Sequence, residues 1–266
     1  MSVEELLRKI ESYLYQERMD VVGVANAADW SSPMKETIPG EILEDCRSIV
    51  VFGKEIPPAT FTARNHAAGL YHQIASNYYI TMDSVATDVA LMLTREGFPS
   101  IPLAGQKPMF MRKGKYWGVV SLKHAAVRAG LGTMGRNSLL INEDFGNRLR
   151  LAGLLTTAPL PAGKPTGKSH CPEKCRKCVE TCPVKALDGS GNIDQYKCLR
   201  RSIASPLMGA LFLSQWLRSF RSADRNFELT GNTLGSIYVY SCHQCLVSCP
   251  HFSRKRNSKR EASEQD

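Results

Sequence analysis

Cysteine placement constrains this chain more than any other feature. Eight of its nine cysteines lie in the last hundred residues, and six of them repeat one pattern, Cys175-x2-Cys178-x3-Cys182-Pro183 and Cys242-x2-Cys245-x3-Cys249-Pro250. Cys171 and Cys198 precede the two runs, and each supplies a fourth thiolate. Eight thiolates in two groups of four match the ligand requirement of two [4Fe-4S] clusters. The sequence therefore predicts a fold organised around two clusters and a role in electron transfer.

The spacing also predicts which cysteines share a cluster. In two-cluster ferredoxins, the cysteine before the proline binds the other cluster. The expected first set is Cys171, Cys175, Cys178 and Cys249, and the expected second set is Cys182, Cys198, Cys242 and Cys245. The chain departs from the ferredoxin pattern in one place, because three residues separate Cys171 from Cys175 where that pattern has two.

Two four-cysteine zinc sites and a disulfide framework are the alternatives. Zinc sites also use Cys-x2-Cys pairs, but a third cysteine three residues later and a following proline are not typical of zinc ribbons. The chain starts Met1-Ser-Val-Glu-Glu5, with acids where a signal peptide has a basic and then an apolar segment. We therefore expect the protein to reside in the reducing cytoplasm. The longest apolar stretch, Leu207–Leu213, is too short for membrane insertion. The lone Cys46 is expected to be a small buried filler.

Composition and linkers predict two folded parts. The chain has 266 residues and is 43% hydrophobic, enough for one substantial core and a cysteine-rich module. Residues 157–170 are rich in proline and glycine, which indicates a linker. We therefore expect an α/β cofactor and substrate domain at 1–160, a double-cluster ferredoxin-like domain at 161–253, and a basic, disordered tail at 254–266.

Helix and strand patterns alternate along the first part. A capping box at Ser2 and Glu5 predicts a helix through about Gln16. Further helices are expected at His66–Glu96, Leu122–Ala129 and Leu199–Phe220, the last in one or two pieces with Trp216 in a core. Strands are expected at Val21–Ala25, Ser48–Phe52, Ser138–Asn142 and Leu149–Leu155. A turn is expected at Asp188–Asn192. Interleaved elements of this kind predict an α/β layered domain within a chain that is α+β overall.

The segment Gly130–Gly135 matches the dinucleotide fingerprint G-x-G-x-x-G. Its context differs, because a dinucleotide loop follows a strand and opens a helix, whereas this segment ends a helix and enters a strand. No acid that could hold a ribose occurs from Phe145 to Pro172. We therefore expect these glycines to permit positive φ or the close approach of a flat ligand.

Basic residues concentrate in one window. The chain carries a net charge of +9, and residues 105–150 hold nine bases against two acids: Lys107, Arg112, Lys113, Lys115, Lys123, Arg128, Arg136, Arg148 and Arg150 against Glu143 and Asp144. Mixed with Phe110, Tyr116 and Trp117, these bases suit a phosphate-bearing, partly flat cofactor or RNA. The alternative is a solvated basic face.

The segments His124–Ile141 and Gly146–Leu160, followed by the double cysteine module, resemble the epoxyqueuosine reductase family, which is related to the reductive dehalogenases. The resemblance covers most of residues 15–252. It implies a nitroreductase-like α/β domain that binds base-off cobalamin, followed by a bacterial ferredoxin-like domain whose two [4Fe-4S] clusters supply electrons. It also implies that the cofactor contacts the glycine segment and the two residues after it, namely Gly130, Gly132, Gly135, Arg136 and Asn137.

The expected proton donor departs from the family pattern. Epoxyqueuosine reductases have an aspartate ahead of the Ala-Gly-Leu-Gly stretch, whereas this chain aligns Tyr116 there and has no carboxylate from Gly97 to Ile141. Tyr116 is the first candidate for the general acid, as a tyrosine is in reductive dehalogenases, and Lys123 and His124 are the second. Packing of Tyr116 beside Trp117 is the alternative.

Two functions follow from these expectations. The first is a cobalamin- and iron-sulfur-dependent reductase that takes electrons from a reduced ferredoxin- or flavodoxin-type donor and acts on tRNA or another substrate. The second is a ferredoxin-type electron-transfer protein without substrate chemistry, whose first domain docks a partner or another cofactor such as a flavin.

Overall fold

The computed structural model describes residues 2–30, 32, 35–106, 109–112, 115–167, 169–204 and 239–253. The predicted helical segment beyond residue 204, with Trp216, and the basic tail at 254–266 lie outside the described residues. Within the described part, no helix is both long and apolar enough to cross a bilayer.

A four-stranded antiparallel sheet organises the first part of the chain. Its order is β1 (Val21–Asn26), β2 (Ser48–Glu55), β8 (Leu149–Thr156) and β3 (Ser100–Leu103). Every residue of β8 and the first six of β2 are buried. The continuous apolar runs of these strands are explained by protein covering both faces of the sheet. The expectation of a mixed α and β architecture is therefore confirmed.

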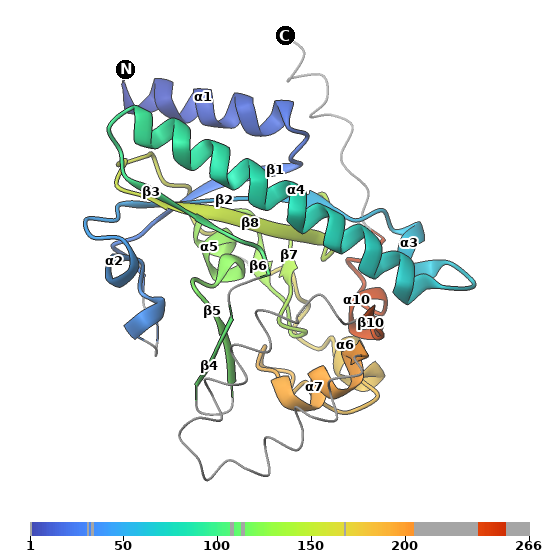
Figure 1. Cartoon of the computed structure of the whole chain (residues 1–266). Helices are drawn as coiled ribbons and strands as arrows, with labels where there is room; N and C mark the ends of the chain where they lie inside the picture. The colour runs from blue at the N-terminus through green and yellow to red at the C-terminus, as the bar shows by residue number, and fades with distance from the viewer. Residues whose placement is uncertain are drawn as a thin grey trace.

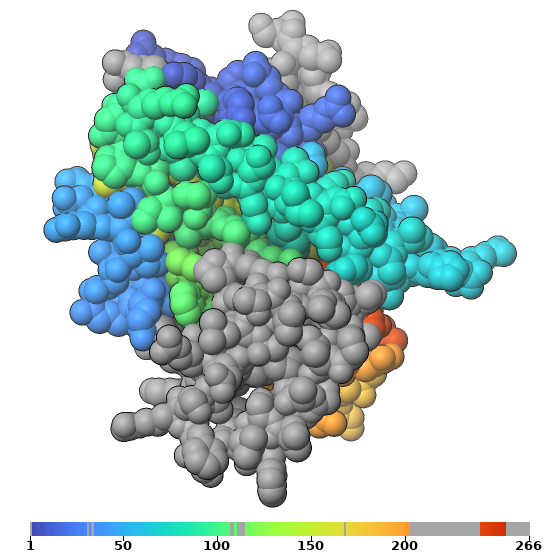
Figure 2. Space-filling model, viewed as in Figure 1, coloured from blue at the N-terminus to red at the C-terminus, as the bar shows by residue number. Residues whose placement is uncertain are grey.

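Helices cover the two faces of this sheet (Figure 1). α1 (Val3–Gln16) and α4 (Ala67–Arg95) pack on one face, and α5 (Leu122–Arg128) packs on the other. α1 begins with the predicted capping box of Ser2 and Glu5. The space-filling view shows that α4 forms much of the outer surface on its side (Figure 2). The long predicted helix is thus present, and it ends just before Gly97, whose φ is 90°.

The remaining elements are short. They are η1 (Lys35–Thr37), α2 (Pro39–Ile42), α3 (Ala59–Thr62), β4 (Met109–Arg112), β5 (Lys115–Gly118), β6 (Thr133–Met134), β7 (Leu140–Ile141), α6 (Lys177–Thr181), α7 (Gln195–Ser202), β9 (Ile203–Ala204), β10 (Val239–Tyr240) and α10 (Gln244–Val247). The strand predicted over 138–142 is reduced to β7, because Ser138 has a φ of 59° and the Asn142 side chain accepts the backbone N–H groups of Asp144 and Phe145. The turn at Asp188–Asn192 is confirmed, since Asp188 accepts the Ser190 N–H at 2.7 Å.

The glycine segment after α5 serves the chain's own packing. Gly130 and Gly132 have φ values of 79° and 152°, as the sequence predicts. A Cβ at Gly130 would lie 2.5 Å from the carbonyl oxygen of Lys164, and one at Gly132 would overlap the carbonyl oxygen of Ile141. The close approach at these two glycines is therefore made by backbone, and a side chain would separate the segments.

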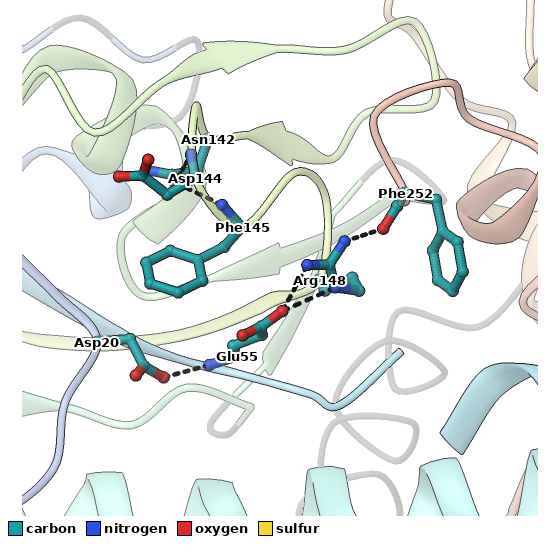
Figure 3. A network of polar contacts seen from close by, with 7 residues as sticks. All are labelled: Asp20, Glu55, Asn142, Asp144, Phe145, Arg148 and Phe252. Carbon is teal, nitrogen blue, oxygen red and sulfur yellow. Dashed lines mark hydrogen bonds and ion pairs between the residues drawn. The ribbon is translucent and has the colours of Figure 1, made fainter. Parts of the chain in front are cut away.

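Arg148 ties the sheet to the chain segment after Cys249 (Figure 3). Its side chain is buried, and its Nε donates to Glu55 Oε1 at 2.9 Å. Nη1 donates to the carbonyl of Phe252, whose ring centre lies 5.7 Å from the guanidinium carbon. Asp20 in turn accepts the Glu55 N–H at 2.7 Å. One side chain therefore joins the end of β2 to the second cysteine module.

Replacing Arg148 with methionine is expected to lower the free energy of unfolding by about 3 kcal/mol, because the half-buried Glu55 carboxylate and a carbonyl lose their charged partner. Chemical unfolding under anaerobic conditions measures this. Arg47→Met, at an exposed position, is the control and should change stability by less than about 0.5 kcal/mol. Equal losses of unfolding free energy in the two variants would contradict the role given to Arg148. The double variant Arg148→Met with Glu55→Gln should recover part of the loss seen in Arg148→Met.

Candidate functional site

The eight cysteines of the second part fall into two groups of electrostatic neighbours, and the described residues, which include all nine cysteines, hold no disulfide. Burial raises the pKa of Cys249, and the charges of Cys178, Cys171 and Cys175 raise it further. Burial raises the pKa of Cys245 to about 12, with Cys198 and Cys242 the next causes. Burial also raises the pKa of Cys198, to which Cys182 and Cys242 add. Cys178 of the first set also raises the pKa of Cys245, but the other neighbours coincide with the first and second sets, and the ligation itself stays a prediction.

The first set surrounds a small cavity of its own. Its wall is formed by Cys171, Cys175, Cys178, Cys249, Arg136, Asn137, Ile141, Pro172, Pro250 and His251. Within the described ranges, no three His, Cys, Asp or Glu side chains are arranged to hold a metal ion at one point. A [4Fe-4S] cluster instead binds its cysteines at four separate iron atoms, so its ligands face one another across the cluster. Four soft thiolates around a cavity fit that group.

A larger cavity, of about 860 Å³, lies between the sheet and the second cysteine module. The three candidate catalytic residues, Tyr116, Lys123 and His124, all line it, and so do Cys242 and Cys245 of the second set. We refer to it as the large cavity. Its volume is in the range of cofactor sites. The structure therefore brings the candidate proton donors to the same space as one of the two cysteine sets.

Positive charge lines the large cavity. Lys123, Arg128 and Arg150 are on its wall, and no aspartate or glutamate is among its described lining residues. Lys123 Nζ donates to the Ser138 carbonyl at 2.7 Å. Burial lowers the pKa of Lys123, and the charge of Arg150 lowers it further. Burial also lowers the pKa of His124, with Lys123 and Arg128 as further causes.

Tyr71 and Arg150 form a buried pair in the large cavity that the sequence did not indicate. Arg150 Nη2 donates to the Tyr71 hydroxyl, and the guanidinium carbon lies 4.9 Å from the Tyr71 ring centre. Tyr240 stacks on Tyr71 with ring centres 4.9 Å apart. Burial raises the pKa of Tyr71, the charge of Arg150 opposes this, and the charge of Cys245 adds to it. The Tyr71 hydroxyl is thus a further candidate proton donor, in the same cavity as Cys242 and Cys245 of the second set.

Tyr116 is held at the wall of the large cavity by α7. Its N–H donates to the Gln195 side chain at 2.6 Å, and the Gln195 amide donates to the Tyr116 carbonyl at 3.0 Å. This pair of hydrogen bonds fixes the backbone of β5 at the cavity wall. Three tyrosines therefore line the large cavity, Tyr71 and Tyr79 from α4 and Tyr116 from β5.

The five residues predicted to contact the cofactor are not gathered in the large cavity. Gly130 and Gly132 line a separate cavity of about 190 Å³. Arg136 and Asn137 line the cavity of the first set. Gly135 packs on Asn137, since a Cβ there would lie 2.7 Å from the Asn137 side-chain oxygen. The reversal of the chain at Gly130 directs this segment toward the cysteine module.

The basic window is only partly a solvated face. Arg148 and Arg150 are buried, and Lys123 and Arg136 donate to carbonyls of the chain. Arg128 donates to the carbonyl of Asp29. Lys107 and Lys113 lie outside the described residues. At least five of the nine bases therefore bind acceptors within the protein.

No family model matches the chain. The epoxyqueuosine reductase of Staphylococcus aureus is 26% identical over 252 residues, which cover 93% of this chain and 57% of that protein. The chain is therefore similar to an epoxyqueuosine reductase over most of its own length. It spans about half the length of such curated relatives. The family resemblance that the sequence predicts is therefore confirmed.

Solved structures related to epoxyqueuosine reductase share the fold. A crystal structure of an epoxyqueuosine reductase with a modified tRNA-Tyr stem loop matches with a TM-score of 0.60 at 20% identity, covering 96% of this chain and 68% of that one. A catabolic reductive dehalogenase matches with a TM-score of 0.60 at 18% identity, covering 96% of this chain and 33% of that one. At these identities the likeness establishes the mixed α and β fold.

Proposed function

We propose that this chain is an oxidoreductase that passes electrons through two [4Fe-4S] clusters to a cobalamin in the large cavity, where a substrate is reduced. One observation carries the proposal: Cys242 and Cys245 line the same cavity as the candidate proton donors Tyr71 and Tyr116. The proposal assigns residues 1–160 to a nitroreductase-like domain, 161–253 to a ferredoxin-like domain and 254–266 to a basic tail, in a cytoplasmic protein.

The arrangement of the cysteines supports an order of electron transfer. The second set contributes to the wall of the large cavity, whereas the first set surrounds a different one. The helix α6, which carries Cys178, packs on α10, which carries Cys245, so the two sets adjoin. Electrons from a reduced ferredoxin- or flavodoxin-type donor would therefore enter at the first set and leave through the second.

The lining of the large cavity fits a corrinoid. The indole N–H groups of Trp30 and Trp117 are buried donors without a partner among the described residues, and Nδ1 of His243 is a buried acceptor without one, because Nε2 of that ring donates to the Phe61 carbonyl at 3.1 Å. All three residues line this cavity. Cobalamin offers amide oxygens and a phosphate to the indole donors and amide N–H groups to the histidine acceptor, and Lys123 and Arg128 add positive charge. When bound, cobalamin supplies a strong reductant and nucleophile. The protein's own contribution is then positioning, exclusion of water and a proton.

Protonation is assigned to a tyrosine of the cavity. The Tyr71 hydroxyl receives a hydrogen bond from Arg150, which leaves its own proton free to point toward a substrate. Arg150 also stabilises the tyrosinate that forms when this proton is given up. Tyr116, Lys123 and His124 remain the other candidates. General acid catalysis of this kind contributes about 10²- to 10⁴-fold to a rate.

The relatives indicate the first substrate to test. They are named epoxyqueuosine reductases, and one solved relative holds a tRNA stem loop that carries epoxyqueuosine. We therefore propose a tRNA bearing epoxyqueuosine as the leading substrate. The missing aspartate between Gly97 and Ile141 favours the second candidate function, an electron-transfer protein without substrate chemistry.

Cobalamin titration of the anaerobically purified protein distinguishes the two functions. We expect stoichiometric binding with an absorption spectrum of the base-off form. Gly118→Trp should weaken binding at least about tenfold because the side chain enters the large cavity, and Gly118→Ala is the control, since its Cβ meets only ordinary contacts. Intact clusters without any cobalamin binding would instead favour the electron carrier.

A further inference from the structure

Arg136 reaches from the loop between β6 and β7 into the first cysteine module. Its Nη1 donates to the carbonyl of Pro172 at 3.2 Å and also to the carbonyl of Cys175, and its Nη2 donates to the carbonyl of Glu173. All three acceptors belong to the loop from Cys171 to Cys175. A single guanidinium therefore holds most of this loop.

This loop is the one that departs from the ferredoxin spacing. The additional residue between Cys171 and Cys175 lengthens the backbone of a largely exposed loop and adds one carbonyl group through which the loop can be held in shape. A guanidinium is suited to that task because its planar fork presents five donors in fixed directions. A lysine at the same position carries the same charge on one flexible nitrogen, and it cannot reproduce the fork.

The residues on either side of Arg136 support the same role. Asn137 Nδ2 donates to the carbonyl of Cys245 at 3.1 Å, so consecutive residues bind one loop of each cysteine set. Gly135 leaves no room for a side chain beside Asn137. The turn 135–137 therefore contacts both cysteine modules from the first part of the chain.

We propose that Arg136 is a positioning residue for the first-set cluster: it holds the lengthened Cys171–Cys175 loop in the shape in which both cysteines reach one cluster. Arg136 also lies on the wall of the first-set cavity, so its fixed charge is beside the cluster. A nearby positive charge favours the reduced cluster and raises its midpoint potential. This inference rests on the proposed function, because it requires two clusters.

The test compares three variants after anaerobic cluster reconstitution. Arg136→Gln and Arg136→Lys should both lose about half of the eight iron atoms and one of the two EPR signals. Arg176→Gln is the matched control, because it removes an exposed positive charge adjacent to Cys175 without touching the loop carbonyls, and it should keep both clusters. Where an Arg136 variant retains some first-set cluster, its midpoint potential in an EPR redox titration should be lower than in the unmodified protein.

The remaining EPR signal reports that each variant has folded. Full iron content with unchanged potentials in both Arg136 variants would overturn the inference, and so would full rescue by Arg136→Lys, which would assign the effect to charge alone. Loss of the cluster in Arg176→Gln as well would also overturn it. Failure of the proposed function is a different result, since the unmodified protein would then bind no pair of clusters.

Discussion

Cys249→Ser is expected to remove the cluster of Cys171, Cys175 and Cys178 and to leave the cluster of Cys242 and Cys245 in place. The reason is geometric: Cys249 lines the same small cavity as Cys171, Cys175 and Cys178, although its sequence neighbours belong to the second set. Serine is a poor ligand for iron in a cluster, so the site with three thiolates should be lost or strongly altered. EPR spectra of the reduced protein, with iron and acid-labile sulfide counts, measure the change.

Cys182→Ser provides the reciprocal control. It should disturb the cluster of Cys198, Cys242 and Cys245 and spare the first set. Cys46→Ser, outside both sets, should leave both EPR signals unchanged. Damage to the Cys242 and Cys245 cluster in the Cys249 variant would show that the ligands are not crossed.

Tyr71→Phe is expected to slow substrate reduction by about 10²-fold or more, while cobalamin affinity and both EPR signals stay unchanged. The phenyl ring preserves packing against Tyr240 and removes only the hydroxyl that Arg150 contacts. Single-turnover reduction of tRNA carrying epoxyqueuosine, scored by nucleoside mass spectrometry, measures the rate. Tyr116→Phe, which removes the hydroxyl of another tyrosine on the wall of the large cavity, is the matched comparison. A large loss in that variant together with normal turnover in Tyr71→Phe would reassign the proton donor to Tyr116.

The helices and buried strands were predictable because their information is local. The capping box of Ser2 and Glu5 and the apolar runs of β2 and β8 depend on neighbours within one element. The shortened strand β7 was not, because the left-handed backbone of Ser138 and the turn at Asn142 interrupt a sequence whose residue types favour a strand. The residue pattern predicts secondary structure poorly where a side chain accepts hydrogen bonds from the backbone N–H groups of the residues that follow it.

The candidate site was predictable only in part. Cysteine spacing predicts how the thiolates group, because few spacings place four cysteines around each of two [4Fe-4S] clusters. The sequence did not indicate Tyr71, because a tyrosine in an amphipathic helix has the pattern of a core residue. Its proposed role depends on Arg150, which is 79 positions away in the sequence. The resemblance assigns Arg136 and Asn137 to the cofactor, which stays a prediction, and in the structure both side chains contact the cysteine loops. The direction in which a loop points is set by tertiary packing.

The hydrogen bonds of Arg148 to Glu55 and Phe252 have a consequence for when the proposed clusters can assemble during synthesis of the chain. Phe252 and Leu246 pack on Ile56, Phe61, Tyr71 and Ala75, and a Cβ at Gly146 would overlap the carbonyl of His251. Cys249 is carried on this pinned segment, which leaves the ribosome after the whole four-stranded sheet. Neither of the two proposed clusters can therefore receive its complete thiolate set until the sheet and the segment up to Cys245 or Cys249 have been synthesised, and iron delivered earlier would meet only half-formed sites.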